Sequence, residues 1–260
     1  MQVYANNAFF QFVSRLVGEK RTHEAFRPYN VGTAKLMGWS TVFWQVDAEG
    51  RIRTGKIMKY GEDGHRVKID GSGKVNWVHS QIRVSGCRMV QCFFGEHLLS
   101  TRPDATIVLV EAEKTAVIAS LFFSDFLWLA TGGNSGCLNP TASQVLNGRE
   151  VKLLPDLGME EDWLKKAEML RPICKSVEML TWLSDQATDE QRTHGLDIAD
   201  FIVKAALPPT PEPKTVLETA PFPDSDKPSF SESVAESVEP FYDPAEWPWP
   251  PPDPNEVCPF

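Results

Sequence analysis

Two acidic residues of this chain follow apolar segments in the same way. Thr106–Val110 is a largely apolar run that leads into Glu111, and Val151–Leu154 is a second run that leads through a proline into Asp156. Runs of this kind are typical of strands buried on both faces of a parallel sheet. Ligands of open α/β sheets bind beyond the carboxyl ends of such strands. Glu111 and Asp156 are therefore candidate catalytic residues and candidate ligands of Mg²⁺ or Mn²⁺, hard cations that carboxylate oxygens bind well.

Two further acids, Asp197 and Asp200, lie at the start of a predicted helix. Their i, i+3 spacing puts them on one helix face. If that helix begins beside the sheet edge, they add metal ligands or hold metal-bound water. The alternative is structural, because acids are common in turns and Asp197 has the type and place of an N-cap. Both interpretations stay open from the sequence.

Basic residues mark two other candidate contacts. Arg51, Arg53, Lys56 and Lys59 alternate in part with apolar residues, so several of them share one face of a predicted hairpin. Such a face binds the phosphate backbone of nucleic acid, or it is a solvated surface over a core. Lys114 opens a later predicted helix, where it reaches a phosphate bound at the helix N-terminus. No residues are predicted to hold an organic cofactor.

The segment that positions the acids, 105–206, alternates strands with helices. Strands are predicted at 106–110, 126–130, 151–154 and 176–183, and helices at 114–123, 140–146, 160–171 and 197–206. This alternation is typical of an α/β domain with a parallel sheet, flanking helices and right-handed crossovers.

The segments on either side differ from this one in their predicted structure. Residues 1–28 predict a helical segment, with a helix that begins after Asn6 or Asn7 and ends at Gly18. Residues 29–104 predict a β-rich, mostly antiparallel module, with a hairpin of strands 41–46 and 51–60. Residues 207–260 hold 15 of the 20 prolines and predict a disordered acidic tail.

The net charge of −9 is unevenly distributed along the chain. Residues 1–104 have 15 basic and 9 acidic residues, residues 105–206 have 9 and 15, and residues 207–260 have 2 and 11. This distribution is expected if the basic module binds a polyanion and the acidic module binds metal cations.

Other features concern the compartment. No apolar run reaches the roughly 18 residues of a membrane span, and the N-terminus has no signal-peptide pattern. Five irregularly spaced cysteines argue against a disulfide framework and indicate a reducing cytoplasm. We expect a cytoplasmic protein that does not bind membranes.

Several motifs together resemble the toprim family. Ile107–Ala116 is similar to its first signature, an apolar strand followed by Glu and a helix, and Leu153–Gly158 to its second, a strand followed by an Asp-x-Asp pair. Gly195–Asp200 resembles a later acidic motif of toprim primases and replicative helicases. Phe93–Leu99 and Thr131–Gly133 resemble segments of bacterial-type primases. The likeness is greatest to toprim-like, primase-related proteins of Bacteroidetes genomes and mobile elements, and it covers roughly residues 29–206.

The resemblance implies a site as well as a fold. Toprim domains use the Glu and the Asp pair to hold Mg²⁺ during phosphoryl or nucleotidyl transfer, so Glu111 and Asp156 match the Glu and the first Asp. The chain departs from the pattern at the second Asp, which is Gly158, and at the small residue after the Glu, which is Ala112 instead of Gly.

Three functions are compatible with these motifs. The first is a primase-like nucleotidyltransferase that acts on DNA or nucleotides in replication or mobilisation, with a helicase or another replication protein as partner. The second is a nucleic-acid-binding scaffold whose toprim site is degenerate, as the glycine at position 158 suggests. The third is a nuclease, because the same metal geometry activates water.

Overall fold

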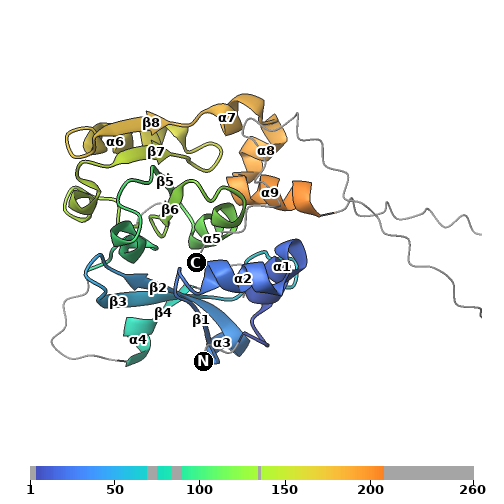
Figure 1. Cartoon of the computed structure of the whole chain (residues 1–260). Coiled ribbons are helices and arrows are strands. Elements are labelled where there is room, and N and C mark those ends of the chain that lie inside the picture. Colours follow the sequence, from blue (N-terminus) through green and yellow to red (C-terminus); the bar gives the residue numbers. More distant parts are fainter. Residues whose placement is uncertain (1–3, 69–74, 83–89, 134–135, 208–260) are drawn as a thin grey trace, which may run out of the picture.

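The computed structural model describes residues 4–68, 75–82, 90–133 and 136–207. The predicted tail, 207–260, lies outside these residues except for its first position. Two four-stranded sheets lie one above the other, the N-terminal one below and the C-terminal one above (Figure 1). In the described part of the chain, no helix combines the length and the apolar character that crossing a bilayer demands.

The N-terminal sheet is antiparallel, in the order β1-β2-β3-β4. Its strands are β1 (Val31–Ala34), β2 (Ser40–Val46), β3 (Ile52–Met58) and β4 (Val75–Trp77). The predicted hairpin is confirmed as β2 and β3, and Gly50 in the turn has a φ of 79°, which glycine adopts without strain. Two short helices accompany the sheet, α3 (Leu36–Trp39) and α4 (Val78–Ile82).

Two helices precede this sheet, α1 (Ala8–Val17) and α2 (Glu19–Phe26). The first was predicted from its caps: the Asn7 side chain accepts a hydrogen bond from the Phe10 N–H, and Gly18 ends the helix with a φ of 83°. The second was not predicted, because its sequence is mostly polar and no apolar face repeats along it.

The C-terminal sheet is parallel, in the order β6-β5-β7-β8. Its strands are β5 (Ile107–Val110), β6 (Leu127–Ala130), β7 (Glu150–Leu153) and β8 (Ser176–Met179). The helices around it are α5 (Glu113–Phe122), α6 (Glu160–Leu170), α7 (Trp182–Gln186), α8 (Asp189–His194) and α9 (Ile198–Ala206). The predicted architecture, a parallel α/β unit preceded by a mostly antiparallel module, is confirmed.

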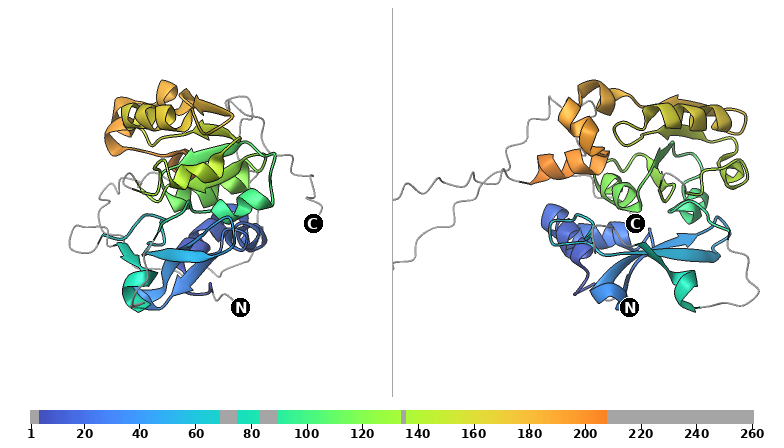
Figure 2. Two further views of the ribbon diagram at one scale, coloured as in Figure 1. Left: turned by 90° about the vertical axis from the view of Figure 1, so that its left-hand side faces the viewer. Right: turned by 180° about the vertical axis from the view of Figure 1, so that it is seen from behind.

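Alternate residues of β5 face two different cores. Ile107 and Leu109 pack with α6, whereas Val108 and Val110 pack with α5, α9 and the N-terminal helices. The core that contains Val108 and Val110 therefore joins the two sheets. In both views of Figure 2, the N-terminal half lies beneath the parallel sheet. The Tyr29 hydroxyl, which donates to the Trp128 carbonyl over 2.9 Å, adds a buried polar contact between the halves.

Candidate functional site

Two carboxylates lie at one edge of the parallel sheet because their strands are neighbours. β5 and β7 pair with Leu109 opposite Leu153. Glu111 is the first residue after β5, and Asp156 is the third after β7. The charge of Glu111 is close enough to Asp156 to raise the pKa of the Asp156 carboxyl group. The structure thus brings together the two residues that the sequence singled out at strand ends.

The negative charge of the Asp156 carboxyl group has few stabilising interactions in the protein. Its Oδ1 atom is buried and has no hydrogen-bond partner among the described residues. Burial is the main cause that raises the pKa of Asp156 to about 8, and three nearby carboxylates raise it further, those of Asp197, Glu111 and Asp200. The charge of Lys114 acts in the opposite direction. An additional cation beside Asp156 would relieve this excess of negative charge.

The donor set fits a hard divalent cation that keeps part of its water shell. The described ranges of the chain contain no ready-made group of three or more His, Cys, Asp or Glu side chains around one point. Mg²⁺ does not need one, because it is commonly bound by one or two carboxylates together with water and substrate phosphates. Glu111 and Asp156 are the residues that would hold it.

Asp197 and Asp200 are already engaged by the protein. They form a capping box at the start of α9, in which Asp197 Oδ1 accepts from the Asp200 N–H over 3.1 Å and Asp200 Oδ2 accepts from the Asp197 N–H over 3.0 Å. Asp197 Oδ2 also accepts from the Thr115 hydroxyl over 2.5 Å. The N-cap alternative raised for Asp197 is confirmed, and the role of the two acids as metal ligands stays a prediction.

Two lysines balance part of this charge. Lys114 donates to Asp200 Oδ1 over 3.3 Å; burial would lower its pKa, but the charges of Asp197 and Asp200 outweigh burial and raise it. Lys166 on α6 lies over the Trp163 ring, 4.7 Å from its centroid. Burial lowers the pKa of Lys166, and the negative charges of the site oppose that shift. The sequence analysis did not identify Lys166. The available signal was that Lys166 follows Trp163, an apolar residue of the same helix, by three positions.

Gly158, which the expected toprim resemblance aligns with a second Asp, has a left-handed backbone. Its φ is +87°, and a Cβ atom there would lie 3.7 Å from the Arg192 carbonyl oxygen. There is room for a side chain, but a non-glycine residue would be strained in this conformation. The backbone of this loop therefore favours glycine at position 158.

Arg51 and Arg53, expected on a nucleic-acid-binding face, converge on one carboxylate of the β2–β3 turn. Both donate through Nε to Asp47 Oδ2, over 2.7 and 2.6 Å, and the Arg51 N–H donates to Asp47 Oδ1 over 2.9 Å. Burial acts to raise the pKa of Asp47, but these hydrogen bonds outweigh it and lower the pKa to about 2. Asp47 thus fixes the turn and uses part of the donor capacity of both arginines.

An Asp47→Asn variant is expected to lose about 1–3 kcal/mol of stability, because a buried charge-assisted network is broken. Since the folded pKa is lowered, the contribution of Asp47 is present above about pH 4 and is lost as the pH falls toward 2. Urea unfolding between pH 2 and 7 measures this. Glu49→Gln, in the same turn but exposed, is the matched control. If the two variants and the wild type lose stability in parallel below pH 4, the account of Asp47 is wrong.

Lys56 and Lys59 also differ from the expected exposed face. Lys56 is buried and donates to Glu113 Oε2 over 3.0 Å and to the Gly132 carbonyl over 2.9 Å. Lys59 is half-buried, with its Nζ against the backbone of Gly38. Lys56 therefore cannot contact a polymer at the surface, because its ammonium group is enclosed between the two sheets.

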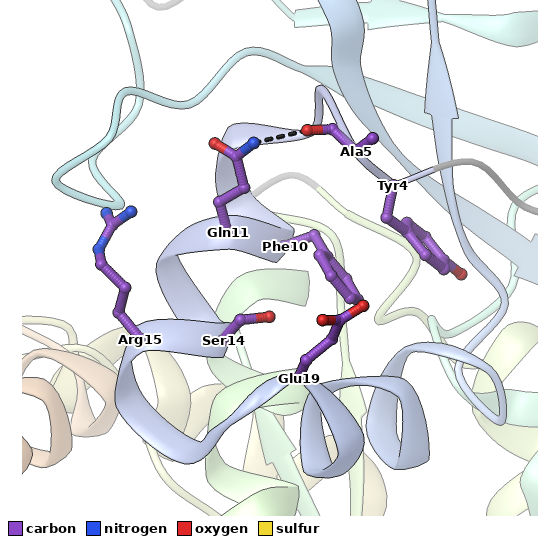
Figure 3. Close-up of a pocket in the computed structure, with 7 residues that line it drawn as sticks. All are labelled: Tyr4, Ala5, Phe10, Gln11, Ser14, Arg15 and Glu19. Carbon is purple, nitrogen blue, oxygen red and sulfur yellow. Dashed lines mark hydrogen bonds between the residues drawn. The ribbon is translucent and has the colours of Figure 1, made fainter.

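A surface hollow of about 360 Å³ lies elsewhere, at the N-terminal helices. Figure 3 shows its lining residues, which are Tyr4, Ala5, Phe10, Gln11, Ser14, Arg15 and Glu19. None of the acids at the edge of the parallel sheet lines it, so we place the candidate site at the strand ends and not in this hollow.

Comparison with protein families gives one match. A family model described as "Domain of unknown function (DUF6371)" matches residues 7–157. The matched range includes Glu111 and Asp156 and ends before Asp197 and Asp200. No curated protein matches the chain.

Similar solved structures come from DNA primases. A chain in the complex of bacteriophage T7 lagging-strand DNA polymerase with primase domains has a TM-score of 0.44 and 17% identity, over 69% of this chain and 85% of that one. The primase fragment of the T7 primase-helicase protein has a TM-score of 0.37 and 15% identity, over 66% and 69%. The Aquifex aeolicus primase has a TM-score of 0.40 and 12% identity, over 74% of this chain and 48% of that one.

Proposed function

The chain belongs to the family described as "Domain of unknown function (DUF6371)", and we propose that it is a primase-like protein that acts on DNA or nucleotides with a divalent cation, in replication or mobilisation of DNA. Glu111 and Asp156 would hold Mg²⁺ or Mn²⁺ and serve as the catalytic carboxylates. The observation that carries this proposal is the Asp156 carboxyl group, whose Oδ1 atom is buried and lacks a partner among the described residues and whose pKa is raised by three nearby acids.

The bound cation would neutralise charge on a transferred phosphoryl group and orient the attacking hydroxyl. The protein side chains have complementary tasks. Asp197 and Asp200 fix the start of α9 and hold Lys114 at the site. Lys166, supported by the Trp163 ring, supplies a second fixed positive charge for phosphate.

We further propose that the antiparallel module guides a nucleic acid strand. Its contacts would be made by Arg51, Arg53 and Lys59, with Lys114 nearer the carboxylates. Arg51 suits this task because its side chain remains 59% exposed while it pairs with Asp47. A helicase or another replication protein would be the partner that delivers the strand.

The second candidate function is a non-catalytic nucleic-acid-binding scaffold. The specific observation in its favour is Gly158, which removes one inner carboxylate and has a backbone that disfavours its return. A scaffold of this kind would bind DNA without any metal-dependent chemistry.

Primer synthesis on single-stranded DNA with ribonucleotides and Mg²⁺ separates these functions. A Glu111→Gln variant is expected to lose activity by about 100-fold or more, since it removes a charged ligand, while its DNA affinity changes little. Lys175→Met, on the exposed end of the sheet, is the control and is expected to keep full activity.

Other outcomes point elsewhere. Template-bound but inactive wild-type protein would support the scaffold, and Mg²⁺-dependent cleavage of a labelled strand would support a nuclease. Full synthesis by Glu111→Gln would refute the catalytic role of that carboxylate.

A further inference from the structure

A buried ion pair joins the antiparallel sheet to α5, the helix that follows Glu111. Lys56 comes from β3 and Glu113 from the first turn of α5, and their side chains are only 7% and 1% exposed. Removing two charges from water is costly, and a buried pair often contributes no net stability over an apolar pair. A contact of this kind across 57 residues of sequence therefore calls for a role beyond stability.

The Lys56 ammonium group also holds the turn after β6. It donates to the Gly132 carbonyl over 2.9 Å. In that turn, the N–H groups of Gly132 and Gly133 donate to the Glu111 carbonyl over 3.0 and 3.1 Å. A continuous chain of hydrogen bonds thus runs from the antiparallel sheet to the backbone of Glu111, the residue that follows β5.

Space around Gly132 is limited in the same region. Its φ is +85°, and a Cβ atom there would lie 3.4 Å from Glu113 Oε1 and 3.5 Å from Gln45 Nε2. The turn therefore lies beside side chains of α5 and β2.

We propose that Lys56 is a positioning residue that clamps Glu113 and the Gly132 turn, and thereby fixes Glu111 at the end of β5. Lys56 acts on the chain at two points next to Glu111: it binds Glu113, two residues after Glu111, and it binds the Gly132 turn, whose N–H groups donate to the Glu111 carbonyl. The antiparallel module is then part of the metal site without contributing a ligand. This inference rests on the proposed function, because it gives Glu111 the role of a metal ligand.

Calorimetric titration with Mn²⁺ tests the clamp, using full-length wild type, Lys56→Met, Lys56→Met/Glu113→Gln and the control Lys175→Met. Residues that orient metal ligands typically change affinity about 10–100-fold. We expect the Mn²⁺ dissociation constant to rise at least about 10-fold in both Lys56 variants and to stay at the wild-type value in the control. The double variant removes both charges, so it is expected to stay folded even if the single variant unfolds.

The double variant also separates positioning from simple structural support. Its urea midpoint is expected to return toward the wild-type value while its Mn²⁺ affinity stays low. Wild-type affinity in the folded double variant would overturn the positioning role and leave the proposed function intact. Absence of Mn²⁺ binding by folded wild-type protein would refute the proposed function, and the positioning role with it.

Discussion

Lys56→Met is expected to lower the free energy of unfolding by about 3–5 kcal/mol, because Glu113 is left buried and unpaired. Lys56 and Glu113 are almost fully enclosed, so water cannot replace the lost ammonium group. Urea unfolding followed by circular dichroism at neutral pH measures the loss. Neutralising both residues in Lys56→Met/Glu113→Gln is expected to restore most of the stability.

The exposed pair of Lys175 and Glu150 provides the control for this prediction. Its N–O distance is 2.8 Å, but the side chains are 67% and 47% exposed. Lys175→Met is therefore expected to cost less than about 1 kcal/mol. If the double variant of the buried pair loses as much stability as Lys56→Met, the unpaired charge is not the cause.

Asp197→Ala is expected to cost about 2–4 kcal/mol, since it removes the cap of α9 and leaves the buried Thr115 hydroxyl without its acceptor. Asp197→Asn keeps a capping oxygen and is expected to cost less than about 1 kcal/mol. Thermal or urea unfolding of the two variants without metal gives this comparison. Equal losses would show that charge, and not capping, is what Asp197 contributes.

The same pair of variants addresses ligation. Because the Asp197 oxygens are occupied by protein donors, Asp197→Asn is expected to keep its Mn²⁺ affinity within about tenfold of wild type. A loss as large as that caused by a change at Asp156 would make Asp197 a direct ligand.

Local signals were sufficient for much of the fold. The Asn7 cap, the Gly18 stop and the turn at Gly50 are short-range features, so α1 and the hairpin were correctly predicted. The continuous apolar strands β5 and β6 and their alternation with helices indicated a parallel sheet. Glu111 and Asp156 followed from the rule that the carboxyl ends of neighbouring parallel strands share an edge. Polar helices such as α2 and α8 have no such signal and were missed.

The roles of individual charged residues were harder to predict. Lys56 alternates with apolar residues as a surface lysine would, and its burial depends on Glu113, a partner 57 positions away. Asp197 has the residue type of both a cap and a ligand, so only its contacts with Thr115 and the α9 backbone distinguish the two. From the sequence, Gly158 indicated only that the second Asp expected from the toprim resemblance is absent. Its left-handed backbone is a property of the folded loop.

Calorimetric titration of the wild type, Glu111→Gln and Asp156→Asn with Mn²⁺ measures whether these two carboxylates bind a cation. We expect one saturable site in the wild type and a loss of affinity of about 100-fold or more in each variant, equivalent to about 2.7 kcal/mol, with Lys175→Met unchanged. Wild-type affinity in folded Asp156→Asn, or no binding by the wild type, would contradict the claim that these two carboxylates hold a divalent cation.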